Sequence, residues 1–121
     1  MEKKIMIVED NEDDLLIMTR VLNQAGITNL VSSENVASAI LLVKEAKPDI
    51  VITDTLLPDG NGFDVCEQIK ESELDPMPKI IVITGSVDAV DAVKAKRVGA
   101  DDYCAKTSDC IPLVEALKKL L

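Results

Sequence analysis

A chain of 121 residues, 47% of them hydrophobic, is long enough to form one domain around a single buried core, and we expect residues 1–121 to form one domain. Its 22 acidic and 13 basic residues give a net charge of −9, which argues against direct nucleic-acid binding and against docking on an anionic membrane. No apolar stretch is long enough to span a bilayer, and no secretory signal begins the chain. Three cysteines without a single histidine indicate small thiols in a reducing cytosol, so we expect a cytoplasmic protein without a zinc site.

Short apolar runs alternate with amphipathic segments five times along the chain, which is the pattern of an α/β fold with a parallel sheet. The first half predicts, in order, a strand at 5–8, a helix from the N-cap Asn11 to Ala25, a strand at 30–31, a helix after Ser33 that ends before Pro48, and a strand at 49–53. The apolar face of the first helix is predicted to contain Leu15, Leu16, Met18, Val21, Leu22 and Ala25.

The second half begins with a loop rich in turn residues at 58–62. It then predicts a helix at 63–71, a strand at 79–84, a helix that follows Gly85-Ser86 and ends at Gly99, a strand at 102–105, and a last helix after Ser108 or Asp109 with Pro112 in its first turn. Right-handed crossovers between five parallel strands then fit a flavodoxin-like sheet with the order 2-1-3-4-5 and helices on both faces.

Polar residues stand where four of the predicted strands end. Glu9-Asp10 follows the first strand, Asp54 the third, Thr84 closes the fourth and Lys106 follows the fifth. The carboxyl ends of parallel strands lie at one edge of a sheet, where ligands bind, so we expect these side chains to meet there. Clustered carboxylates repel one another unless a cation neutralises them, and oxygen ligands suit Mg²⁺.

Asp54 is also a candidate nucleophile, because a carboxylate can attack a phosphoryl group and form an aspartyl phosphate. The transition state requires positive charge and hydrogen-bond donors, which Lys106 and Thr84 can supply. A simpler interpretation remains for each residue alone: a solvated strand end for Glu9-Asp10, a surface lysine for Lys106, and a half-buried ring on an edge strand for Tyr103. Phe63 is expected in the core.

Four segments resemble the response-regulator receiver domain of two-component signalling, and the resemblance covers essentially the whole chain. They are IMIVEDN (5–11), DIVITDTLLPDGNGFDV (49–65), IIVITG (80–85) and GADDYCAK (99–106). The resemblance implies that Asp54 accepts a phosphoryl group from a histidine kinase or a histidine phosphotransfer protein. It also implies that Glu9, Asp10, Asp54 and the backbone carbonyl of Leu56 bind Mg²⁺.

The same resemblance implies that Thr84 and Lys106 contact the phosphoryl oxygens and that Tyr103 is a switch residue that turns inward when Thr84 moves. The signal would then reach an unknown downstream effector through the surface formed by the helix that follows Gly85-Ser86, strand 102–105 and the last helix, where a homodimer could also form. The chain would be a phosphoacceptor and not an enzyme with a separate substrate.

Two positions near the candidate site bear on its chemistry. Thr107 follows Lys106 where the family usually has proline, often after a cis bond. A cis bond before a residue other than proline costs about 2.5–4 kcal/mol, so we expect a trans bond with a rearranged loop, or a strained cis bond. Leu56, two residues after Asp54, cannot orient a water molecule, so we expect slow autodephosphorylation.

Two alternative functions remain from the sequence. One is a receiver-like scaffold that works without phosphate, for which the missing proline is the support. The other is a phosphatase with an aspartyl-phosphate intermediate, against which Leu56 counts because such enzymes usually have a second aspartate at that position.

Overall fold

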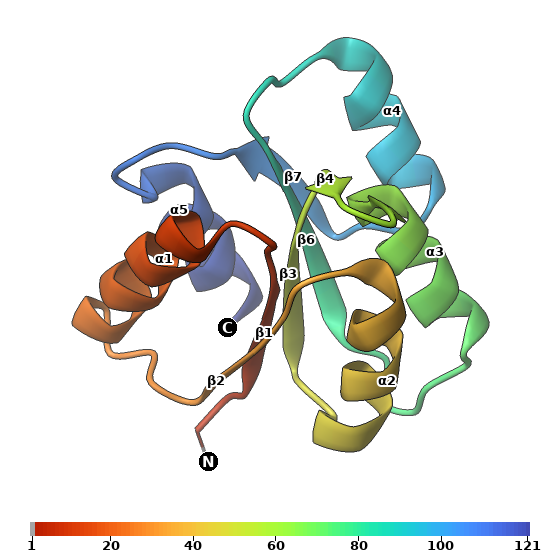
Figure 1. The fold of residues 1–121 in the computed structure, drawn as a ribbon, viewed down its shortest axis with the longest axis horizontal. Helices are drawn as coiled ribbons and strands as arrows, with labels where there is room; N and C mark the ends of the chain where they lie inside the picture. The colour runs from red at the N-terminus through yellow and green to blue at the C-terminus, as the bar shows by residue number, and fades with distance from the viewer. Residues whose placement is uncertain (1) are drawn as a thin grey trace.

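Five parallel strands form the central sheet of the computed structural model, which describes residues 2–121 (Figure 1). They are β1 (Ile5–Val8), β2 (Leu30–Ser33), β3 (Ile50–Asp54), β6 (Lys79–Thr84) and β7 (Asp102–Ala105). Their order across the sheet is β2-β1-β3-β6-β7, with every neighbouring pair parallel. This confirms the predicted flavodoxin-like fold and its strand order 2-1-3-4-5.

Helices cover both faces of this sheet, as Figure 1 shows. They are α1 (Glu12–Gln24), α2 (Val36–Ala46), α3 (Gly62–Glu71), α4 (Ala89–Arg97) and α5 (Ile111–Leu120). The pair α1 and α5 packs on one face, while α2 and α3 pack on the other. Among the described residues, no helix has the length and apolar character needed to cross a membrane.

Burial on both faces explains why the central strands are continuous apolar runs. In β1, Ile5 and Ile7 belong to the core cluster with α1 and α5, whereas Met6 and Val8 belong to the cluster with α2 and α3. Successive side chains of a strand point to opposite faces, so both sets must be apolar. Phe63 is buried in a smaller cluster with Val82, as expected.

Small differences from the predicted boundaries occur at several elements. β2 extends to Ser33, β3 includes Asp54, and α3 begins at Gly62. Leu16, predicted on the apolar face of the first helix, is instead exposed, because the helix buries Met18 and Leu22 and turns Leu16 away from the sheet.

The helix predicted directly after Gly85-Ser86 begins only at Ala89, so that boundary was wrong. The side chain of Asp88 caps α4 by accepting a hydrogen bond from Asp91 N–H at 2.8 Å. Ser86 N–H instead donates to Thr84 Oγ1 at 3.2 Å, which keeps this residue in the loop. The helix also ends at Arg97, before the predicted end at Gly99.

The last helix likewise begins later than predicted. Cys110 precedes its first residue, Ile111, and adopts a left-handed conformation with φ of 56°. Asp109 Oδ1 accepts hydrogen bonds from Ile111 N–H at 3.0 Å and from Thr107 Oγ1 at 2.7 Å. These contacts hold residues 107–110 as a turn, so the helix does not start directly after Ser108 or Asp109.

The loop after Asp54 contains a two-stranded hairpin that the turn residues alone did not predict. Its strands are β4 (Leu56–Leu57) and β5 (Gly60–Asn61), which pair antiparallel. Between them, the Asp59 carboxylate accepts hydrogen bonds from Val36 N–H at 2.7 Å and Ala37 N–H at 3.0 Å. The loop that follows Asp54 is thereby attached to the first turn of α2.

Candidate functional site

The carboxyl ends of the strands place the predicted site residues at one edge of the sheet. In the register of the strands, Asp54 pairs with Ile83 of β6, and Thr84 pairs with Ala105 of β7. Glu9, Asp54 and Thr84 are buried there, and Lys106 is half-buried. The structure therefore brings these four side chains together at the edge where the sequence predicted them.

The ammonium group of Lys106 is the centre of this site. Its Nζ lies 2.5 Å from Glu9 Oε1, 2.6 Å from Asp54 Oδ2 and 2.7 Å from Asp14 Oδ2. Burial by itself would lower the pKa of Lys106, but the hydrogen bonds to Asp14, Asp54 and Glu9 raise it overall. Lys106 is therefore a permanent positive charge beside Asp54.

The peptide bond between Lys106 and Thr107 is trans, because the cis bond found among residues 2–121 is the one before Pro76. Lys106 nevertheless points at Asp54, and its backbone N–H donates to Thr84 O at 2.7 Å. Of the two arrangements expected from the missing proline, the structure has the trans bond with the lysine in place.

Asp54 is fixed by hydrogen bonds to both of its carboxylate oxygens. Oδ2 accepts from Lys106, while Oδ1 accepts from Leu56 N–H at 3.2 Å and, more weakly, from Thr55 Oγ1 at 3.5 Å. Burial opposes ionisation, but hydrogen bonds with Glu9, Lys106 and Leu56 outweigh it and lower the pKa of Asp54. Asp54 is thus ionised near neutral pH, as a nucleophile must be.

Glu9 has the opposite character. It is 1% exposed, and its Oε2 atom is buried without a hydrogen-bond partner among the described residues. Burial is the main cause that raises the pKa of Glu9 to about 8, and the nearby Asp54 adds to the rise while Lys106 opposes it. The pKa of Glu9 is therefore raised while the pKa of Asp54 is lowered, as expected for two like charges in one site.

The hydroxyl of Thr84 takes part in a chain of hydrogen bonds. Thr55 Oγ1 donates to Thr84 Oγ1 at 3.3 Å, and Thr84 Oγ1 donates to Ser86 O at 3.3 Å. Thr84 is therefore tied to the loop before α4. Tyr103, on the edge strand β7, is half-buried, and its hydroxyl is buried without a partner in the part of the chain that the structure describes.

The predicted Mg²⁺ ligands can be tested against these surroundings. The donors are all oxygens, and the unpaired Oε2 of Glu9 is a buried atom that a hard cation would satisfy, so the residues fit the ion chemically. Asp10 is exposed, and the Leu56 side chain is 78% exposed. Within residues 2–121 no three acidic side chains already surround a metal position; the Lys106 ammonium bridges Glu9 and Asp54 instead.

Two residues of the site were missed at the sequence level, Asp14 and Thr55. Asp14 is the third of three consecutive acidic residues in the first turn of α1, where acidic residues commonly stabilise a helix. Thr55 is a hydroxyl directly after Asp54 and is buried. The signal that could have found Asp14 is that the first helix starts at the same sheet edge as Lys106.

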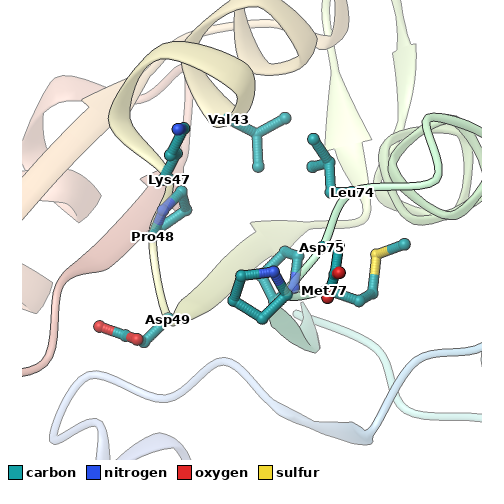
Figure 2. A pocket seen from close by; sticks show the side chains of 9 residues that line it. Val43, Lys47, Pro48, Asp49, Leu74, Asp75 and Met77 are labelled. Atoms are coloured by element: carbon teal, nitrogen blue, oxygen red, sulfur yellow. The ribbon is translucent and has the colours of Figure 1, made fainter.

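A small cavity of about 120 Å³ lies at the opposite edge of the sheet (Figure 2). It is formed where Pro48 and Asp49 lead into β3 and where Met77 and Pro78 lead into β6, next to Val43 of α2. These are the amino ends of the strands, whereas Asp54 and Thr84 lie at the carboxyl ends. The cavity is therefore separate from the candidate site.

Comparisons with known proteins agree with the fold. A family model described as the response regulator receiver domain matches residues 5–118. The protein PilH of Pseudomonas aeruginosa is 33% identical over 119 residues, which cover 98% of this chain and 97% of PilH. The DNA-binding response regulator MtrA of Mycobacterium tuberculosis is 34% identical over 106 residues, but these are 88% of this chain and only 45% of MtrA.

Solved structures show the same fold. A two-component response regulator of the LuxR family from Aurantimonas has a TM-score of 0.89 and 26% identity, with 99% of this chain and 85% of the other covered. The chemotaxis protein CheY4 of Vibrio cholerae has a TM-score of 0.90 over the full length of both chains at 20% identity, which shows the fold alone.

Proposed function

This chain belongs to the response-regulator receiver domain family of two-component systems, and from this membership we propose that it is a phosphorylation-dependent switch whose phosphoacceptor is Asp54. The observation that carries the proposal is the contact of 2.6 Å between Lys106 Nζ and the buried Asp54 carboxylate. A lysine that points away from Asp54 would have favoured the scaffold without phosphate chemistry.

The proposed reaction is the transfer of a phosphoryl group from a phosphohistidine to Asp54. An oxygen of the Asp54 carboxylate attacks phosphorus, a P–O bond forms, the P–N bond breaks, and the bonding electrons leave with the imidazole, which takes up a proton. The lowered pKa of Asp54 keeps the attacking oxygen ionised. Lys106 and the Thr84 hydroxyl would donate to the equatorial oxygens, on which the charge of the transition state is spread.

Mg²⁺ is part of the proposal. Glu9, Asp10, Asp54 and the backbone carbonyl of Leu56 would hold the ion. When bound, it would supply positive charge next to the transferred phosphoryl oxygens. The unpaired oxygen of Glu9 supports this assignment.

We further propose the following partners and surfaces. The phosphodonor is a sensor histidine kinase or a histidine phosphotransfer protein, and the response passes through Tyr103 to the surface of α4, β7 and α5, where an effector or a second copy would bind. Exposed apolar side chains on that surface, among them Val90, Val93 and Ile111, support such a contact. The chain would act in the cytoplasm as an acceptor and relay, and it would not turn over a separate substrate.

The proposal is tested by intact mass after incubation with acetyl phosphate and Mg²⁺. We expect one phosphoryl adduct on the wild type, no adduct on the Asp54→Asn variant, and loss of the adduct when the metal is chelated. Asn keeps the size of the side chain, so the variant is a matched control. If the wild type takes up no phosphoryl group, the proposal is wrong and the scaffold function replaces it.

A further inference from the structure

Three carboxyl groups surround the Lys106 ammonium, and an ammonium has three N–H donors. Two of the three, Glu9 and Asp54, belong to the acceptor site described above. The third, Asp14, lies on α1, with its Oδ2 atom 2.7 Å from Lys106 Nζ. All three donors of the lysine are therefore engaged, and one of them is engaged by a residue outside the proposed acceptor and metal ligands.

Asp14 is held in place by local structure. It is the third residue of α1, and its backbone N–H donates to the side chain of the N-cap Asn11 at 3.0 Å. The cap fixes the first turn of α1 directly after β1, at the sheet edge where Lys106 follows β7. The carboxylate is 38% exposed and the lysine side chain 20% exposed, so the pair forms the solvent side of the site.

The position of Asp14 becomes important when the other two partners change. Under the proposed function, Glu9 and Asp54 would be engaged by a cation and by the incoming phosphoryl group. Asp14 is the partner of Lys106 that takes part in neither. Asp14 can keep the flexible side chain of Lys106 from turning out to solvent. Thr107, which follows Lys106 in the chain, is exposed and does not hold the lysine in place.

We propose that Asp14 is a positioning residue that holds the Lys106 ammonium beside Asp54. This inference rests on the proposed phosphoacceptor function for its consequence, although the contact itself exists in the protein without phosphate. The hydrogen bond from Lys106 to Asp14 is also the leading cause that raises the pKa of the lysine against the effect of burial.

The test compares Asp14→Ala with Asp13→Ala. Both variants remove one carboxylate from the same turn of α1, but Asp13 is exposed and is not among the partners of Lys106. The first measurement is the side-chain ¹H–¹⁵N signal of the Lys106 ammonium in metal-free protein, assigned by its loss in Lys106→Met. An ammonium held by acceptors exchanges its protons with water slowly enough to give this signal. The second measurement is the rate of phosphorylation by acetyl phosphate.

We expect Asp14→Ala to lose the ammonium signal and to be phosphorylated about two- to fivefold more slowly, the range for a partly exposed ion pair. Asp13→Ala should match the wild type in both measurements. A signal that persists in Asp14→Ala overturns the inference, and so does a lost signal with an unchanged rate. If the wild type takes up no phosphoryl group, the proposed function fails, and the ammonium signal alone decides whether Asp14 positions Lys106.

Discussion

Gly62 gives the sharpest test of the packing behind Asp54. It is the first residue of α3, and its N–H donates to Thr55 O at 3.1 Å. A Cβ atom at Gly62 would lie 2.4 Å from the carbonyl oxygen of Asp54 and 3.1 Å from its carbonyl carbon. Both are backbone atoms, so they cannot rotate away. We predict that Gly62→Ala forces α3 and the end of β3 apart.

The cost follows from two opposing contributions. Overpacking of this kind costs about 1–3 kcal/mol, whereas replacing glycine by alanine restores about 0.4–1 kcal/mol by restricting the unfolded chain. A net loss of about 1–2 kcal/mol in the free energy of unfolding is expected, and for a domain of this size it lowers Tm by about 3–12 °C. Urea denaturation and thermal unfolding monitored by circular dichroism measure both quantities.

Gly85→Ala is the matched control. Gly85 stands next to Thr84 at the same edge of the sheet, but a Cβ atom there would meet nothing within 4 Å. Its free energy of unfolding should stay within about 0.5 kcal/mol of the wild type. If Gly62→Ala is as stable as Gly85→Ala, the close approach of α3 to Asp54 does not exist in solution and the reasoning is wrong.

Three further predictions concern the acceptor site. Leu56→Asn should shorten the lifetime of the phosphorylated protein, because a polar side chain there can orient water. Leu56 is 78% exposed, so the free energy of unfolding should not change. An unchanged lifetime would contradict this reasoning. Thr55→Val should lower the free energy of unfolding by about 0.5–1.5 kcal/mol, because it removes the hydroxyl that donates to Thr84. Thr55→Ser keeps a hydroxyl, so urea denaturation should show a smaller loss of stability for this variant. For Glu9, the pKa raised from 4.5 to about 8 means that the folded state binds one more proton than the unfolded chain between these values. The free energy of unfolding of the metal-free protein should therefore fall as the pH rises through this interval, and Glu9→Gln should flatten that slope; a flat profile in the wild type would show that Glu9 ionises normally.

The sheet was predictable from sequence because strands buried on both faces appear as short, nearly continuous apolar runs. The central strands are therefore mostly apolar, although β3 also buries Thr53 and β6 buries Thr84. The start of α4 was not predictable in this way. Ser86 and Asp88 can both cap a helix, and the choice depends on Thr84, whose hydroxyl accepts from Ser86 N–H in the folded protein.

Some residues of the candidate site could likewise be predicted from sequence and others could not. The strand-end rule placed Glu9, Asp54 and Lys106 at one edge, because that rule depends on topology alone. It could not find Asp14, because an acidic residue in the first turn of a helix has an adequate local explanation. Only the folded arrangement, in which the Lys106 ammonium lies 2.7 Å from the Asp14 carboxylate, turns that residue into a partner of the lysine. The hairpin after Asp54 was missed for a related reason, since two-residue strands are too short to show periodicity.

The hydrogen bonds of Thr84 indicate how an event at Asp54 would reach the rest of the molecule. The Thr84 hydroxyl now bonds to Thr55 and Ser86, and Ser86 lies in the loop between β6 and α4. Under the proposed function, a phosphoryl group would bring roughly −1.5 to −2 charges and draw the hydroxyl toward Asp54. Thr84 cannot move there and keep both hydrogen bonds with Ser86. Under the proposed function, the loop before α4 is therefore the segment whose conformation would depend on phosphorylation. The loop would then have two conformations, the one described here and one in which Thr84 contacts the phosphoryl group. Phosphorylation can favour the second only by the amount by which the second binds the phosphoryl group more strongly than the first.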